Sequence, residues 1–113
     1  GHNIYPVEIE SLALRHDAIA KAAAFAVPDE RLGEKVCLAI IPVEGRDIDA
    51  DALLAHLAAE GLSKFDMPEY FMAAEDLPMT ASGKVLKRLL VDQARNGEIE
   101  LQAIRYRAPQ SGN

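Results

Sequence analysis

The chain has 113 residues, the length of a single domain, and half of them are apolar while 27% are charged, a balance typical of globular rather than disordered chains. Its 18 acidic and 12 basic residues give a formal net charge of -6, which argues against a general nucleic-acid-binding protein or a ligand of anionic membranes. No apolar run reaches the roughly 20 residues of a membrane-spanning helix, and no signal-peptide pattern is visible, so we expect a cytoplasmic location.

The chain begins with signals for a helix followed by a strand. Pro6 suits the first turn of a helix, and apolar residues at spacings of three and four continue to about His16. Residues 19–27 are rich in alanine but alternate in their larger side chains, which favours a strand, and Pro28 is expected to end it. The pattern therefore predicts a helix over 6–16 and a strand over 19–27.

A second strand and a second helix follow. Residues 35–43 form an apolar run that predicts a buried strand. Cys37 lies inside this run, with nothing nearby to lower its pKa, so we expect a small buried side chain rather than a reactive thiol. Asp49 is placed to cap a helix that runs to Glu60, and Gly61 is placed to end it.

The last third of the chain predicts one more strand and one more helix. Residues 69–74 have the composition of a strand, and Leu86, Leu89 and Leu90 predict the apolar face of a helix that ends near Asn96. The tail over 109–113 is expected to be disordered. This order predicts an α+β fold: a small sheet of about three main strands, largely antiparallel, covered by helices.

A Gly-Lys pair, Gly83 and Lys84, stands before the last predicted helix, where phosphate-binding loops place theirs. Such a loop requires a glycine five positions before the pair and a Ser or Thr directly after it. Pro78 and Val85 occupy those positions, so a phosphate-binding loop is excluded. The residues alone leave two readings of Lys84: a functional lysine, or an incidental one behind a helix cap made by Ser82 and Gly83.

Metal and hydrolase sites are not indicated either. The three histidines are scattered, and although His56 and Glu60 lie four residues apart on a predicted helix, no third ligand is in sight. The chain has no Gly-x-Ser-x-Gly elbow of the kind that carries a nucleophilic serine. Solvated helix faces explain the histidines and Glu60, so we expect no metal site in this chain.

Two motifs at opposite ends of the chain together resemble one known family. The first contains Gly1, Asn3, Ile4, Tyr5, Pro6, Glu8, Ile9 and Glu10, and the second contains Leu77, Pro78, Thr80, Ser82, Gly83, Lys84 and Lys87. In this order and spacing they are similar to the C-terminal domain of the adenylate-forming enzymes, the superfamily of acyl-CoA synthetases, peptide-synthetase adenylation domains and firefly luciferase. Residues 64–71 and the second motif most resemble carboxylate-CoA ligases for medium-chain, cyclic or aromatic acids.

The resemblance implies that residues 1–108 form the mobile lid domain of a larger enzyme. The large N-terminal domain, absent from this chain, would hold ATP, Mg²⁺ and the acid. Reaction of the acid with ATP would give acyl-AMP and pyrophosphate. Lys84 would be the catalytic lysine of this adenylation step, on a flexible polar loop supported by Thr80, Ser82 and Gly83. The basic residues that follow, Lys87 and Arg88, are expected to be solvated.

In the second step the acyl group passes to the thiol of CoA, and the resemblance places Gly1, Asn3 and Ile4 near its pantetheine arm. Some relatives use basic residues around the proline that is Pro68 here to hold the phosphates of CoA. This chain has acidic residues on both sides of Pro68, which leaves Lys64 as a weaker substitute.

Two alternatives remain beside the carboxylate-CoA ligase. One is the same domain from an adenylation enzyme that loads a carrier protein, and the other is a non-catalytic binding module. The ligase reading implies three partners, namely the enzyme's own N-terminal domain, a small carboxylic acid and CoA, with no nucleic acid. In that reading the fragment alone is expected to be inactive.

Overall fold

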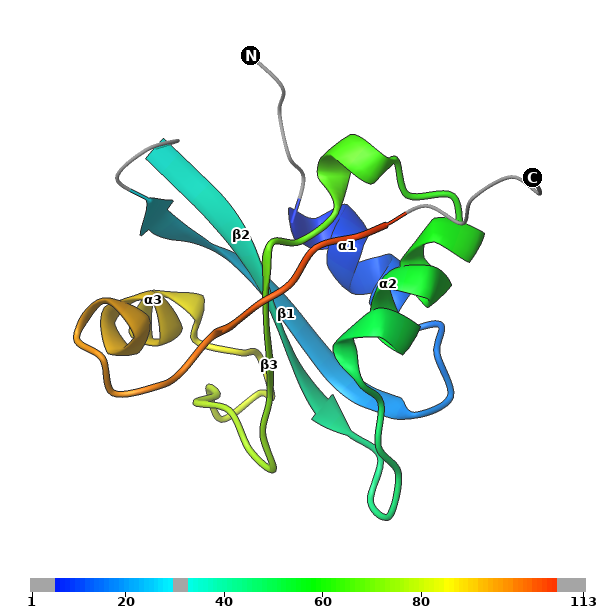
Figure 1. Ribbon diagram of the computed structural model, residues 1–113. Coiled ribbons are helices and arrows are strands. Elements are labelled where there is room, and N and C mark those ends of the chain that lie inside the picture. Colours follow the sequence, from blue (N-terminus) through cyan, green and yellow to red (C-terminus); the bar gives the residue numbers. More distant parts are fainter. Residues whose placement is uncertain (1–5, 30–32, 108–113) are drawn as a thin grey trace, which may run out of the picture.

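The structure is a computed structural model that describes residues 6–29 and 33–107 (Figure 1). Its elements in chain order are α1 (Pro6–Ala13), β1 (Ile19–Asp29), β2 (Gly33–Pro42), α2 (Ala50–Ala59), the 3-10 helix η1 (Lys64–Asp66), β3 (Tyr70–Ala73), α3 (Lys87–Arg95) and β4 (Gln102–Ala103). None of the described helices combines the length and the apolar character that crossing a bilayer requires. The predicted tail at 109–113 lies outside the described residues.

The strands form one sheet in the order β1-β2-β3-β4. The pairs β1-β2 and β3-β4 are antiparallel, whereas β2 and β3 run parallel, with Leu38 opposite Phe71. The parallel pair is possible because the chain crosses back through α2 before it enters β3. The predicted α+β fold with a small, largely antiparallel sheet is confirmed, and β4 is a fourth, short strand that the sequence did not indicate.

Helices cover both faces of the sheet, with α3 on one side and α1 and α2 on the other (Figure 1). The side of α1 and α2 contains the larger cluster of buried residues, including Leu38 and Leu53. The side of α3 contains a smaller cluster that includes Phe25, Cys37 and Leu90. Alternate residues of β1 and β2 supply the two clusters, as the two-residue period of a strand requires.

Cys37 is fully buried in the cluster beneath α3, as predicted. Because burial disfavours the charged thiolate, it raises the pKa of the Cys37 thiol to about 12. This thiol is therefore protonated at neutral pH, and its side chain acts as a small apolar group in the core.

The strand β1 extends two residues beyond the predicted end. Pro28 pairs with Glu34, and Asp29 pairs with Gly33, so the proline does not stop the strand. β1 is an edge strand with β2 as its neighbour in the sheet. Proline is tolerated there because an edge strand does not need every backbone N–H for a second partner.

The first helix starts at Pro6 as predicted but ends at Ala13, earlier than the expected His16. After Ala13 the chain turns, and Nδ1 of His16 accepts a hydrogen bond from the backbone N–H of Ala18 over 3.0 Å. This local bond stabilises a turn in place of another helical residue. The chain thereby reverses into β1 without a longer loop.

Local signals set both ends of α2. The side chain of Asp49 accepts a hydrogen bond from the backbone N–H of Ala52 over 2.8 Å, which makes it the predicted N-cap. After the helix, Gly61 has a φ of 100°, a conformation that favours glycine and ends a helix. The predicted helix between these two residues is confirmed.

The last helix is less buried than its leucines suggest. Leu90 is buried, but Leu86 and Leu89 are 41% and 42% exposed, so the predicted three-leucine face is wrong. The partly buried Val91 and Ala94 complete the packed side of α3. Leu90 is therefore the only buried residue of α3, whereas Val91 and Ala94 are only partly buried.

Candidate functional site

The segment before α3 folds into a tight hairpin. Met79 and Val85 pair as an isolated antiparallel bridge. Within it, the backbone N–H of Thr80 donates to the carbonyl of Lys84 over 2.8 Å, and the N–H of Gly83 donates to the carbonyl of Thr80 over 2.9 Å. This is the pattern of a type I turn followed by a residue of positive φ, and Gly83 supplies that residue with a φ of 87°.

We call residues 79–85 the Lys84 hairpin. A side chain also ties it together, because Oγ1 of Thr80 accepts a hydrogen bond from the backbone N–H of Lys84 over 3.1 Å. The same Oγ1 lies 3.0 Å from Oγ of Ser82. The polar residues that the sequence singled out beside Lys84 are therefore parts of one hydrogen-bonded turn, rather than of an open loop.

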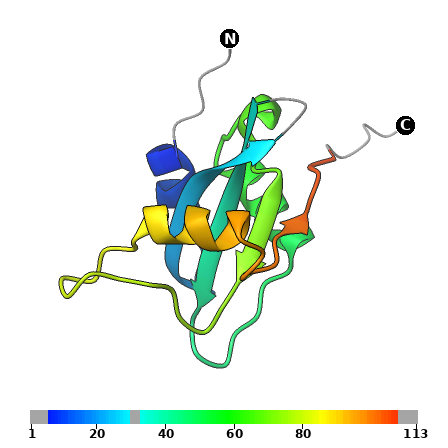
Figure 2. The ribbon, with the colours of Figure 1, turned by 90° about the vertical axis from the view of Figure 1, so that its left-hand side faces the viewer.

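The hairpin displays Lys84 away from the body of the domain. Figure 2 shows the segment around residue 80 projecting beyond α3 and the sheet. The side chain of Lys84 is exposed. The helix begins only at Lys87, and its N-cap, Leu86, makes no side-chain hydrogen bond, so the alternative in which Ser82 and Gly83 cap the helix is wrong.

Lys87, three residues further on, is not simply solvated as expected. Its Nζ lies 2.5 Å from Oε2 of Glu10 on α1, and the same oxygen accepts a hydrogen bond from the backbone N–H of Ala24 on β1 over 2.7 Å. The two side chains are only 38% and 17% exposed. This arrangement, which we call the Glu10–Lys87 bridge, joins the two motifs in space; Arg88, in contrast, is exposed.

His56 and Glu60, considered above for metal binding, have other partners. Nε2 of His56 lies 2.8 Å from the carbonyl of Leu12, and the guanidinium of Arg15 donates to Oε1 of Glu60 over 2.8 Å. The hydrogen bond and charge of Arg15 hold the pKa of the Glu60 carboxyl below its usual range. These contacts join α2 to the end of α1, so both residues have structural roles.

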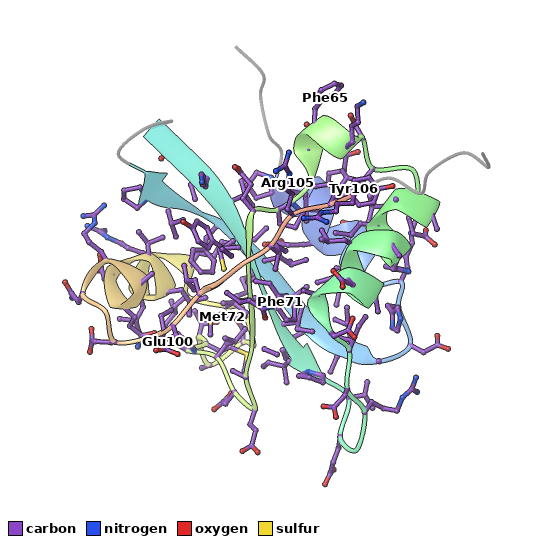
Figure 3. All side chains as sticks on the ribbon, viewed as in Figure 1. Phe65, Phe71, Met72, Glu100, Arg105 and Tyr106 are labelled. Atoms are coloured by element: carbon purple, nitrogen blue, oxygen red, sulfur yellow. The ribbon has the colours of Figure 1, made fainter. Side chains whose placement is uncertain are left out.

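A groove with several basic side chains lies at the end of the sheet near η1. It measures about 450 Å³ and is lined by residues of β2, η1, the start of β3 and the last described segment, including Lys35, Lys64, Pro68, Glu69 and Arg105. Nζ of Lys35 lies 5.7 Å from the ring centre of Tyr70. Figure 3 shows Arg105 and Tyr106 at the same end of the molecule as Phe65.

The sequence missed Lys35 and Arg105 as candidate site residues, because neither lies in a motif. Arg105 stands 36 positions after Glu69, yet the N–H of Ile104 donates to the carbonyl of Glu69 over 3.0 Å and brings the two segments together. The first predicted motif residues, Gly1, Asn3 and Ile4, lie outside the described residues. The described residues begin at Pro6, the first residue of α1.

A mixed sheet between two helix layers, with an exposed Gly-Lys hairpin before the last helix, is the architecture expected for the C-terminal domain of an adenylate-forming ligase. The chain belongs to the family described as "AMP-binding enzyme C-terminal domain", whose model matches residues 8–84. The match includes Glu10 and Lys84.

Curated relatives and solved structures agree with this family. The chain is 36% identical over 92 residues to a probable CoA ligase of Humulus lupulus, covering 81% of this chain and 17% of that protein. It is 40% identical over 87 residues to the indoleacetate-CoA ligase of Aromatoleum aromaticum, covering 77% of this chain and 17% of that protein. It is 29% identical to an acyl-CoA synthetase of Brucella canis whose crystal structure superposes with a TM-score of 0.78, over 88% of this chain and 19% of that one.

Proposed function

We propose that this chain is the mobile C-terminal domain of an ATP-dependent carboxylate-CoA ligase and that Lys84 acts in the adenylation of the acid. The observation that carries the proposal is the position of Lys84, exposed on a hydrogen-bonded hairpin that projects from a domain of the AMP-binding enzyme family. None of the grooves described among residues 6–29 and 33–107 is lined by Lys84, whose side chain is exposed. The complementary part of the active site, with ATP and Mg²⁺, would lie on the N-terminal domain.

The chemistry explains why a lysine belongs on such a hairpin. A carboxylate oxygen of the acid attacks the α-phosphorus of ATP, and the bond from that phosphorus to the bridging oxygen breaks to release pyrophosphate. Two anionic groups approach each other in this step, and an ammonium group between them offsets their repulsion. A lysine held in place by a turn loses less freedom at that moment than one on an open loop.

In the second half-reaction the CoA thiolate would attack the acyl carbon, and AMP would leave with the electrons of the acyl-oxygen bond. We propose that Gly1, Asn3 and Ile4 approach the pantetheine arm during this step. Their place in the sequence supports the proposal, because they stand shortly before Pro6, the first residue of α1, and 80 positions or more before Lys84, so that separate motifs would serve the two half-reactions. Pantetheine is a neutral, extended chain and needs no charged partner there.

The nucleotide end of CoA, in contrast, is strongly anionic, and the groove near η1 offers a place for it. Lys35, Lys64 and Arg105 bring three positive charges to the groove against the negative charge of Glu69. Phe65 also lines the groove, and Nζ of Lys64 lies 5.2 Å from the centre of its ring, so the ring places this ammonium group beside the groove. The acidic neighbours of Pro68 therefore do not exclude phosphate binding at this end of the domain.

The test of the adenylation role uses Lys84→Ala in the full-length enzyme, with Lys21→Ala on β1 as a control that removes the same charge elsewhere. Adenylation, measured as pyrophosphate exchange into ATP, should fall about 100-fold or more in Lys84→Ala. Transfer of the acyl group from supplied acyl-AMP to CoA should change little. Equal losses in both half-reactions would refute the assigned role of Lys84.

A second assay tests the acceptor. Release of acyl-CoA with free CoA supports the ligase, whereas transfer to a carrier protein alone would support the alternative enzyme. Arg105→Ala should raise the KM for CoA several-fold. The increase in KM should be smaller when the substrate is CoA that lacks its 3'-phosphate. The acid itself is proposed only as a medium-chain, cyclic or aromatic carboxylate, in line with the indoleacetate-CoA ligase among the relatives.

A further inference from the structure

The Glu10–Lys87 bridge occupies an unusual place in the fold. α1 and α3 cover opposite faces of the sheet (Figure 1), and this contact between them is made beside β1, the edge strand. Glu10 reaches this edge from α1, where its Oε2 accepts the backbone N–H of Ala24. Lys87 reaches it from the opposite layer. One carboxylate thus connects α1, the edge strand and α3.

The charge of Lys87 is otherwise badly placed. Lysine in the first turn of a helix opposes the helix dipole, which favours negative charge at that end. α3 has no acidic residue in its first turn, and its N-cap, Leu86, makes no side-chain hydrogen bond. Glu10 supplies from another helix the negative charge that the start of α3 lacks. The Glu10–Lys87 bridge therefore offsets the unfavourable charge at the start of α3, which an ordinary surface ion pair does not do.

The packing of α3 makes its first residue important. Leu90 is the only residue of this helix that is buried, so apolar contacts hold the middle of α3 more firmly than its beginning. The beginning of α3 is also the base of the Lys84 hairpin. There the backbone N–H of Leu86 donates to the carbonyl of Pro78 over 2.8 Å, and that of Lys87 donates to the carbonyl of Val85 over 3.1 Å.

We infer that Glu10 and Lys87 are positioning residues, which fix the base of the Lys84 hairpin to α1 and thereby orient Lys84 for adenylation. The functional part of this inference rests on the proposed function, whereas its structural part does not. Loss of the bridge leaves Lys84 present but allows the base of its hairpin to move. The expected result is a lower adenylation rate with the chemistry of Lys84 itself intact.

The test compares Lys87→Met and Glu10→Gln in the full-length enzyme with two matched controls, Arg88→Met and Glu8→Gln. Each control removes the same charge from a neighbouring exposed position on the same helix. Lys87→Met should lower kcat for pyrophosphate exchange by about tenfold, the usual scale for a charged hydrogen bond, with little change in KM for ATP. The controls should stay within about twofold.

Coupling and rescue separate positioning from simple destabilisation. The double variant Glu10→Gln with Lys87→Met should lose no more activity than the worse single variant, because both break one interaction. Lys87→Arg should recover most of the rate. Acyl transfer from supplied acyl-AMP should stay within about twofold of the unmodified enzyme, since residues in the bridge are expected to act on the Lys84 hairpin alone.

A measurement without substrate tests the structural part by itself. Hydrogen exchange of the amides in residues 78–90 should be faster in Lys87→Met than in Arg88→Met, while exchange in α2 should be equal. Unchanged exchange and unchanged adenylation in Lys87→Met would overturn the inference. If exchange rises but Lys84→Ala leaves adenylation intact, the bridge holds the hairpin as inferred, and the proposed role of Lys84 is what fails.

Discussion

Oγ1 of Thr80 lies 3.1 Å from the backbone nitrogen of Lys84 and accepts its hydrogen bond. A single hydroxyl thus fixes the backbone of the residue that we propose as the catalytic lysine. The same threonine uses its own N–H and carbonyl to close the turn. Thr80 is therefore the residue on which the geometry of the Lys84 hairpin depends most directly.

Thr80→Val should separate this contact from the size of the side chain. Valine keeps the shape of threonine but cannot accept the N–H of Lys84, and one lost hydrogen bond corresponds to about a fivefold to tenfold lower adenylation rate in the full-length enzyme. Thr80→Ser keeps the hydroxyl and should stay within about twofold of the original rate. Equal pyrophosphate-exchange rates for Thr80→Val and the unmodified enzyme would show that the contact is dispensable.

Gly83→Ala should weaken the hairpin through its backbone. Gly83 has a φ of 87°, and an added Cβ would meet no other atom within 4 Å, so the cost is conformational rather than steric crowding. We expect a loss of about 1 kcal/mol in the free energy of forming the turn. Gly83→Asn should cost less because asparagine adopts positive φ more readily. Hydrogen exchange of the hairpin amides checks this order. Slower exchange in Gly83→Ala than in Gly83→Asn would contradict it.

Leu90→Ala should destabilise the domain far more than Leu89→Ala. Leu90 is fully buried against the sheet, and its truncation leaves a cavity that costs about 3 kcal/mol in the free energy of unfolding. Leu89 is 42% exposed, so its truncation should cost about 0.5 kcal/mol or less. Urea unfolding of the two variants measures the difference. Similar losses for both leucines would contradict the packing of α3.

Cys37 should make stability depend on pH in the alkaline range. Its pKa is about 12 in the folded chain, whereas an unfolded cysteine titrates at about 8.5, so between these values only the unfolded state releases the proton. The free energy of unfolding should therefore fall with rising pH by about 1.4 kcal/mol per pH unit from this group. This part of the slope begins above the unfolded pKa.

Cys37→Ala removes that contribution and keeps a small apolar side chain. The stability advantage of the unmodified chain over Cys37→Ala should shrink between about pH 8 and about pH 10. Urea unfolding at each pH measures it, and groups that titrate in both proteins cancel in the comparison. A difference that stays constant over this range would mean that the thiol ionises without unfolding.

The elements with strong local signals were predictable from the sequence. Asp49 and Gly61 mark the two ends of α2, and Pro6 marks the start of α1. β4 was not predictable, because two exposed residues, Gln102 and Ala103, carry no alternating pattern, and pairing with β3 alone makes them a strand. The end of β1 was missed for a related reason, since only its place at the sheet edge allows Pro28 to continue it.

The candidate site was predictable only where a motif carried it. Lys84 and its polar neighbours were identified through the resemblance, and their catalytic role stays a prediction. The contact between Glu10 and Lys87 was not predictable, because it depends on two helices from opposite layers meeting at one strand edge. The position of Arg105 was not predictable either, because it depends on the hydrogen bond from the N–H of the preceding residue, Ile104, to the carbonyl of Glu69.

The alternation along β2 also determines how this domain can pair its strands. Leu38 and Ile40 point to the side of α1 and α2, whereas the smaller Cys37 and Ala39 point to α3. A shift of β2 by one residue would exchange these sets, force bulky side chains beneath α3 and leave voids beneath α1 and α2. The volumes of four consecutive side chains thus disfavour a sheet in which β2 is shifted by one residue. The same two clusters also determine which face of the sheet α3 covers, and α3 follows directly after the Lys84 hairpin.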